Sequence, residues 1–196
     1  MSQQLARTVA AQRGADLLPV MATIEAETNF RNVLGEYAAA TARFGIGFGQ
    51  VHLRWHFETL RQVAQELDVD LPSQINPMHD DAANEPFRRL ILNNDLLSMS
   101  LAVAVIDRIW RRTGNFESFT RAYVGAGISE RDMERRRVIW TRWVNTLAQE
   151  TTPRPVQAAP RPVQATPQQQ AEQIGLAVIT LIGLIAASII LPKNGN

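Results

Sequence analysis

Residues 96–106 of the 196-residue chain, LLSMSLAVAVI, form a run of apolar or small side chains between Asp95 and Asp107. A helix of this length is too short to span a membrane, but its composition suits a helix that is buried on nearly all sides. Elsewhere in residues 1–150 we find no alternating strand pattern of useful length. We therefore predict an all-α, or nearly all-α, domain that contains one long helix over about residues 86–112.

Helical signals lie on the N-terminal side of this run. Asp16 is placed to cap a helix that continues to about residue 28, and Pro19 falls in its first turn, where the missing N–H is tolerated. A second helix is predicted over about residues 50–67. Residues 68–86 contain three prolines and are predicted to be a loop.

Helical signals also follow the run. Gly114 and Asn115 predict its end, and Ser129 with Asp132 resembles a capping box at the start of a last helix. Helical spacing predicts that four residues of this last helix face the core, namely Met133, Trp140, Val144 and Leu147. The three arginines at positions 135–137 are predicted to lie on a solvated face.

The composition changes after residue 150. Half of the ten prolines lie in residues 153–167, so residues 151–173 are predicted to be an extended Pro/Gln-rich linker. Residues 174–191 carry no charge, and as a helix they would span roughly 27 Å, enough for a bilayer core. We expect a single C-terminal transmembrane helix here, followed by a short polar tail at 192–196, and a folded domain over 1–150.

Charge and cysteine content exclude several classes of function. The chain has no cysteine, which excludes disulfides, a thiolate nucleophile and a Cys-based zinc site. Its formal net charge of +1 argues against a nucleic-acid partner. His52 and His56 have the spacing of a zinc pair, but no third ligand is evident, and we expect no metal or other cofactor.

Three short segments carry the functional signal. They are Glu27-Thr28-Asn29-Phe30, Gly47-Phe48-Gly49-Gln50-Val51 and Ala122-Tyr123-Val124-Gly125. Taken singly, each has an ordinary explanation as a helix end or a glycine turn. The glycine-rich segment is not a phosphate-binding loop, because neither GxGxxG nor GxxxxGK[ST] is present.

In this order, the three segments resemble the Slt-type lytic transglycosylases of the lysozyme-like superfamily, over about residues 8–127. Three departures stand out. Thr28 occupies the position of a serine, Val124 that of an asparagine, and the usual Ser-x-x-Gly-Ala pattern is missing between Glu27 and Gln50. The resemblance implies a lysozyme-like fold and cleavage of peptidoglycan strands.

The resemblance also implies roles for single residues. Glu27 would be the one catalytic carboxyl group, first acid and then base, and Tyr123 would orient it. Gln50 and the backbone near Gly47 and Gly49 would contact the sugar, with Thr28 supplying the hydroxyl of the first motif. In the alternative reading, Tyr123 is a core residue and Gln50 a polar residue at a helix N-terminus.

The chemistry of the cleavage fits a single glutamate. A carboxyl group at the end of an apolar helix, partly desolvated by Met21 and Phe30, has a raised pKa and can donate a proton near neutral pH. Glu25 competes with Glu27 for this role, but on a helix the two point in different directions. The second carboxylate that most glycosidases need has no obvious candidate, although four acidic residues stay open: Glu36, Glu58, Asp80 and Asp81.

The sequence therefore predicts a membrane-anchored lytic transglycosylase. Its partners would be peptidoglycan strands and, through residues 174–191, a lipid bilayer. The N-terminus shows no secretory signal, so we expect a virion protein of a membrane-containing bacteriophage, with a bacterial cell-envelope protein as the alternative. A second possibility for the function is a non-catalytic scaffold or wall-binding protein with the same fold. Hydrolysis in place of transglycosylation also stays open.

Overall fold

The computed structural model describes residues 1–38, 43–73 and 85–151. By its contacts the chain divides into Met1–Thr152 and Pro153–Asn196, and all described residues belong to the first unit. Except for Thr151, the predicted linker, transmembrane helix and tail lie outside the described residues. Within those residues, no single helix has the length and hydropathy to cross a membrane. The helices Glu85–Asn93 and Asp95–Thr113 pass the same criteria only as a pair, across a bend of 102°.

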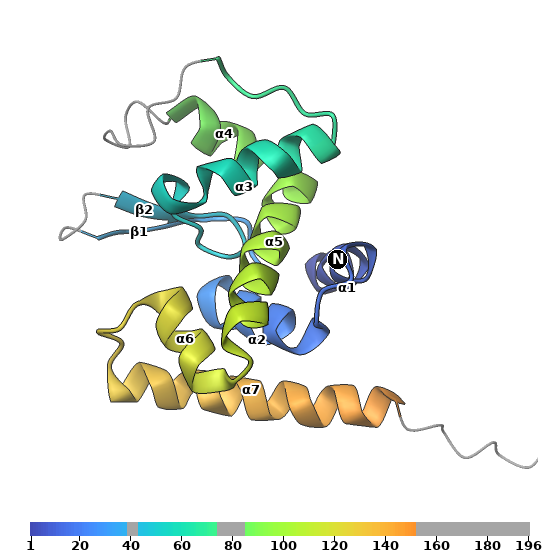
Figure 1. Ribbon diagram of the computed structural model, residues 1–196, viewed down its shortest axis with the longest axis vertical. Coiled ribbons are helices and arrows are strands. Elements are labelled where there is room, and N and C mark those ends of the chain that lie inside the picture. The colour runs from blue at the N-terminus through green and yellow to red at the C-terminus, as the bar shows by residue number, and fades with distance from the viewer. Residues whose placement is uncertain (39–42, 74–84, 152–196) are drawn as a thin grey trace, which may run out of the picture. The chain divides into compact units, whose positions relative to one another are not determined.

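The described unit is mostly helical, as predicted, with one small hairpin (Figure 1). In chain order its elements are α1 (Ser2–Arg13), α2 (Leu17–Thr28), β1 (Leu34–Ala38), β2 (Arg43–Ile46), α3 (Leu53–Glu66), α4 (Glu85–Asn93), α5 (Asp95–Thr113), α6 (Phe116–Val124) and α7 (Glu130–Thr151).

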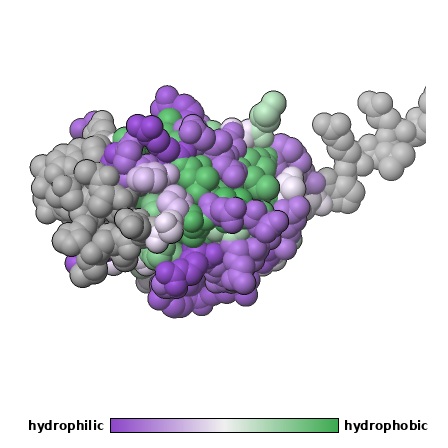
Figure 2. Space-filling view, turned by 90° about the horizontal axis from the view of Figure 1, so that it is seen from above, coloured by the Kyte–Doolittle hydropathy of each residue, from purple (hydrophilic) through white to green (hydrophobic). Residues whose placement is uncertain are grey.

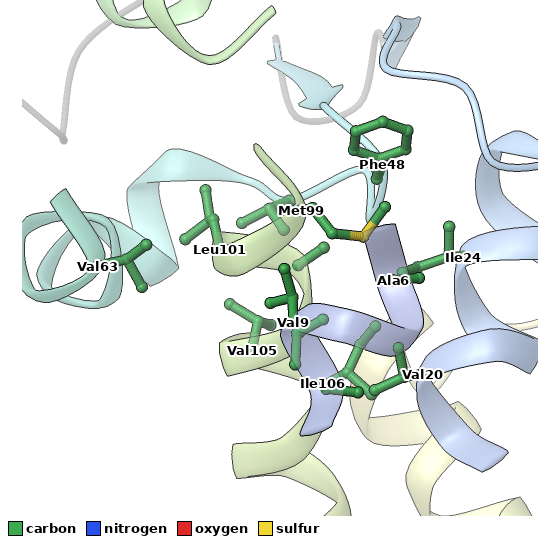
Figure 3. Close-up of a cluster of buried hydrophobic side chains, with 14 of the residues drawn as sticks. Ala6, Val9, Val20, Ile24, Phe48, Val63, Met99, Leu101, Val105 and Ile106 are labelled. Carbon is green, nitrogen blue, oxygen red and sulfur yellow. The ribbon is translucent and has the colours of Figure 1, made fainter. Parts of the chain in front are cut away.

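The helix α5 is the centre of the fold and contacts α1, α2, α3, α4 and α6. The predicted burial of residues 96–106 is confirmed for most of the run, although Leu96 at its start is 44% exposed. Figure 3 shows side chains of α5, among them Met99 and Ile106, packed with Val9 of α1 and Ile24 of α2.

Two predicted helix ends are confirmed. The Asp16 side chain accepts a hydrogen bond from the Leu18 amide and caps α2, with Pro19 in the first turn. Gly114 ends α5 with a φ of 68°, a left-handed conformation that glycine adopts without steric cost. The second predicted helix is confirmed as α3, but it begins at Leu53 instead of Gln50.

The single long helix predicted over residues 86–112 is wrong. It is divided into α4 and α5, which are bent by 102° at Asn94. Asn94 has an extended backbone, and its side chain accepts a hydrogen bond from the Leu97 amide at 3.0 Å. Asparagine is a favoured N-cap, so this residue starts a new helix inside the apolar pattern. Pro86 lies in the first turn of α4, not in the loop.

The hairpin of β1 and β2 is an antiparallel element that the sequence pattern did not predict. Its strands have five and four residues, too short for a clear alternation. It lies on the same side of α5 as α3 and α6 in Figure 1.

The helix α7 packs along α2 and closes the domain. The start predicted from Ser129 is confirmed, since its hydroxyl oxygen accepts a hydrogen bond from the Asp132 amide at 3.2 Å. At the other end of α7, Glu150 forms two hydrogen bonds with Arg7 of α1, at 2.8 and 2.9 Å.

The face that α7 buries differs in one residue from the prediction. Val144 is 41% exposed, so its predicted core position is wrong. The neighbouring Trp143 is buried instead and continues the seven-residue pattern that Met133, Arg136 and Trp140 begin.

A surface view from the side of α3 and α4 shows apolar residues surrounded by polar ones (Figure 2).

Candidate active site

Glu27 lies in the last turn of α2 and forms an ion pair with Arg136 of α7. Arg136 Nη1 lies 2.8 Å from Glu27 Oε1, and the two side chains are only 9% and 15% exposed. Arg136 also donates through Nε to Oδ2 of Asp132 at 2.9 Å. A buried guanidinium is therefore shared between two carboxylates.

The prediction that residues 135–137 lie on a solvated face is wrong for Arg136. Arg135 and Arg137 are exposed, but Arg136 belongs to the face of α7 that packs on the domain. Its position three residues after Met133 and four before Trp140 was the signal for this, because such spacing puts all three on one helix face. Arg136 is the site residue that sequence reasoning missed.

Burial raises the pKa of the Glu27 carboxyl above its ordinary value of 4.5. The charge and hydrogen bond of Arg136 act in the opposite direction, and the loss of solvation is the larger effect. Met21 and Phe30, which were expected to desolvate this glutamate, are both buried. The pKa of Glu27 is therefore above its ordinary value although a cation lies next to its carboxyl group.

Thr28 joins the end of α2 to the glycine-rich turn. Its buried hydroxyl lies 3.1 Å from the Ile24 carbonyl oxygen in its own helix and 3.0 Å from the Phe48 carbonyl oxygen. The residue after Glu27 therefore holds the first and second motifs together.

The glycine-rich turn is hydrogen-bonded to α5. The Phe48 amide donates to Ser98 Oγ at 3.2 Å, and that hydroxyl donates to Asn32 Oδ1 at 2.8 Å. Gly47 has a φ of 75°, and a Cβ there would lie only 2.3 Å from Ser98 Oγ. Only glycine fits this position, for reasons of both conformation and space.

Tyr123 brings the third motif to the same turn. Its hydroxyl donates to the Gly49 carbonyl oxygen at 2.5 Å, and a Cβ on Gly49 would lie 2.8 Å from that hydroxyl. Burial, and after it the charge of Glu27, raises the pKa of Tyr123 well above 10. Tyr123 thus lies close enough to Glu27 for the carboxylate charge to act on its pKa, but its hydroxyl donates its hydrogen bond to the turn.

Gln50 has a structural task in the hairpin. Its Nε2 donates to the carbonyl oxygens of Val33 at 3.1 Å and Gly47 at 3.0 Å. A Cβ on Gly35 would lie 1.7 Å from Gln50 Oε1. The side-chain amide of Gln50 therefore occupies the space that any side chain at position 35 would need. The side-chain amide of Gln50 is thus bound to backbone, and the sugar contact that the resemblance implied stays a prediction.

The other acidic candidates differ from Glu27 in their surroundings. Glu25 accepts hydrogen bonds from Arg142 and from Trp143 Nε1, the latter at 2.7 Å. Glu58 is 79% exposed. The side chains of Glu36, Asp80 and Asp81 lie outside the described residues. Asp132 is the carboxylate whose charge acts on Glu27, and it is hydrogen-bonded by Arg135 and Arg136.

A groove of about 500 Å³ lies beside Tyr123, between the start of α3, the second half of α5 and the end of α6. Its lining includes Gln50, Trp55, His56, Arg112, Tyr123 and Val124.

His56, one of the two histidines with the spacing of a zinc pair, lies next to an arginine. His56 Nδ1 lies 2.7 Å from Arg108 Nη2, and because arginine can only donate, this nitrogen accepts. Burial, and after it the Arg108 charge, lowers the pKa of His56 to about 4. Across residues 1–38, 43–73 and 85–151, no group of three or more His, Cys, Asp or Glu side chains could hold a metal ion.

A scan of known protein families, a search of curated proteins and a search of solved structures each found no match to this chain. The functional assignment therefore rests on the residues themselves. The fold brings all three predicted motifs to one region, around Glu27, the turn at residues 47–50, and Tyr123.

Proposed function

We propose that this protein is a membrane-anchored peptidoglycan lytic transglycosylase with a lysozyme-like fold. It would cleave the β-1,4 bond between N-acetylmuramic acid and N-acetylglucosamine. The observation that carries the proposal is the buried Glu27 at the end of an apolar helix, where desolvation raises the pKa of its carboxyl.

The proposed reaction uses this one carboxyl group twice. Protonated Glu27 gives its proton to the glycosidic oxygen as the bond from that oxygen to C1 of the muramic acid breaks. The C6 hydroxyl of the same muramic acid then attacks C1 and gives its proton to the Glu27 carboxylate. The products are a 1,6-anhydro end and a free 4-hydroxyl, no water is consumed, and Glu27 returns to its protonated form.

Arg136 has a consistent role in this scheme. When Glu27 loses its proton, a negative charge appears in a place with little water, and the guanidinium 2.8 Å away stabilises it. Asp132 holds Arg136 from the other side, which limits how strongly Arg136 lowers the pKa of Glu27. Tyr123 and Thr28 fix the glycine turn against the end of α2.

Anchoring is proposed from the uncharged residues 174–191, with a virion membrane of a bacteriophage as the location and local wall opening during infection as the task. A bacterial cell envelope is the alternative location. Flotation of the full chain with liposomes, against a chain that ends at residue 173, tests the anchor. Equal flotation of both chains would remove it.

The enzymatic proposal is tested with the full chain on purified peptidoglycan, followed by mass spectrometry of the fragments. We expect 1,6-anhydro products from the unmodified chain and a loss of about 10²–10⁴-fold in rate for Glu27→Gln. Glu117→Gln, a change at a glutamate that is 63% exposed, serves as the matched control. Fragments without anhydro ends would make the protein a hydrolase.

A non-catalytic scaffold or wall-binding protein is the second candidate. The observation in its favour is the same ion pair, because a carboxylate bound to a buried arginine is a stable structural contact as well. This candidate predicts binding to peptidoglycan without fragments, and with equal affinity for the unmodified chain and Glu27→Gln.

A further inference from the structure

The groove beside Tyr123 combines apolar and cationic side chains. Among its lining residues, Trp55 is 57% exposed and Val124 is 41% exposed, so the groove presents two large apolar side chains to solvent. A volume of about 500 Å³ lies within the range of small-ligand sites. The Arg54 guanidinium lies over the Trp55 ring, 5.7 Å from its centroid, and the exposed part of the indole can pack against the apolar face of a sugar.

The charge in the groove has one sign. Arg112, in the last turn of α5, is exposed and forms no ion pair with any described residue, whereas the adjacent Arg111 pairs with Asp107 at 2.7 Å. No carboxylate of the described chain lines the groove. His56 adds a hydrogen-bond donor, since its Nδ1 accepts from Arg108 and the remaining proton lies on Nε2.

This lining is complementary to an anionic ligand that also has an apolar face. A guanidinium pairs well with a carboxylate, in two parallel hydrogen bonds. Where a muramic acid carries a stem peptide, its own lactyl carboxyl group is a neutral amide, and the carboxylates belong to that peptide. A strand that reached Glu27 past Tyr123 would bring both groups to this groove.

We infer that the groove binds a peptide-substituted muramic acid unit, with Arg112 pairing with a carboxylate of the stem peptide and Trp55 packing against a sugar ring. The inference rests on the proposed function and gives it a substrate class, namely glycan strands that still carry their peptides. Arg112 is in this view a specificity-determining residue and takes no part in the proton transfers.

Binding measurements on the full chain with Glu27→Gln test the inference, because this variant leaves the ligand intact. The probes are the disaccharide of N-acetylglucosamine and N-acetylmuramic acid with its tetrapeptide, and the same disaccharide with its lactyl carboxyl group capped as a neutral methylamide in place of the peptide. We expect the peptide-bearing probe to bind about tenfold more tightly, the effect of one charge-assisted contact. When Arg112→Gln is combined with Glu27→Gln, the preference for the peptide-bearing probe should disappear. Arg131→Gln in the same background is the control and should keep the preference, because Arg131 is an exposed arginine with no ion pair to a described residue.

Trp55→Ala provides a second variant. It should weaken both probes by a similar factor, because the indole is assigned to the sugar and not to the peptide. Thermal unfolding of each variant checks that the fold is kept. Equal binding of the two probes, no binding of either, or the same loss of preference in Arg112→Gln and Arg131→Gln would overturn the assignment.

Lysis by the chain with Glu27 intact is recorded separately. If the chain prefers the peptide-bearing probe but causes no lysis, the groove assignment holds and the proposed enzymatic activity is contradicted. Lysis without that preference would keep the enzyme and remove the groove assignment.

Discussion

Arg136 Nη1 lies 2.8 Å from Oε1 of Glu27, across 109 positions of the sequence. The pair connects α7 to the end of α2, and both side chains are largely removed from water. The pKa of Glu27 depends on the balance between this contact and the cost of burying its carboxyl group.

The first prediction concerns the stability that depends on this pair. Arg136→Gln leaves Glu27 and Asp132 without their shared cation, and removal of one partner from a buried pair costs about 3–5 kcal/mol in the free energy of unfolding. Arg137→Gln is the matched control on the next residue, because Arg137 is 46% exposed and its pairs are worth about 1 kcal/mol or less. Urea unfolding followed by circular dichroism measures both. Equal losses in the two variants would contradict the structural role of Arg136.

The second prediction concerns pH. Because the folded state raises the Glu27 pKa above 4.5, it binds this proton more tightly than the unfolded state does. The contribution of the carboxyl to stability is therefore fully present below about pH 4.5 and is lost as the pH rises through the raised pKa. The stability of the unmodified chain relative to Glu27→Gln should fall as the pH rises from 4 to 8. Unfolding curves of both proteins over this range measure this relative stability. If the unmodified chain instead became more stable relative to Glu27→Gln as the pH rises, the Glu27 pKa would be lowered and not raised.

The third prediction concerns the close approach at Gly49. In Gly49→Ala the new Cβ would lie 2.8 Å from the Tyr123 hydroxyl and 2.9 Å from Cβ of Ala102 in the middle of α5. Such overpacking costs about 1–3 kcal/mol. Gly127→Ala is the control, since nothing lies within 4 Å of its Cβ. Thermal unfolding distinguishes them, and an unchanged midpoint for Gly49→Ala would mean that Tyr123 can move away.

The fourth prediction concerns Thr28. Thr28→Val keeps the shape of the side chain but removes the hydroxyl that reaches the Phe48 carbonyl, which should cost about 1–3 kcal/mol for the buried oxygen left without it. Thr146→Val removes a hydroxyl that bonds only a carbonyl of its own helix at an exposed position, and should change stability by about 0.5 kcal/mol or less. Chemical unfolding of both variants gives the comparison. A cost for Thr28→Val no larger than that of Thr146→Val would show that the contact with the turn is dispensable.

The features that could be predicted from sequence are local ones. The Asp16 cap, the end of α5 at Gly114 and the burial of most of residues 96–106 follow from side chains within a few positions of each other. The bend at Asn94 was not predicted, because an asparagine can lie within a helix or cap a new one. Only the hydrogen bond from the Leu97 amide to the Asn94 side chain shows that it is a cap.

The features that could not be predicted depend on distant partners. The spacing of Arg136 from Met133 and Trp140 puts it on the packed face of α7, but its pairing with Glu27, 109 positions away, cannot be inferred from that spacing. The hairpin is held by the side chain of Gln50, whose bonds to Val33 and Gly47 exist only in the folded chain. The predicted role of Gln50 as a sugar contact was drawn from its place in a motif, without knowledge of these bonds.

The position of α7 also determines when the site can exist during synthesis. Glu27 is made early, but its cation comes 109 residues later, and the contact between Arg7 and Glu150 joins residues 143 positions apart. A ribosome must therefore complete nearly the whole domain before Glu27 acquires the surroundings described above. Contacts of such long sequence separation also slow folding. The nascent chain consequently carries no assembled site, and any activity appears only after α7 has been released and has packed on α2.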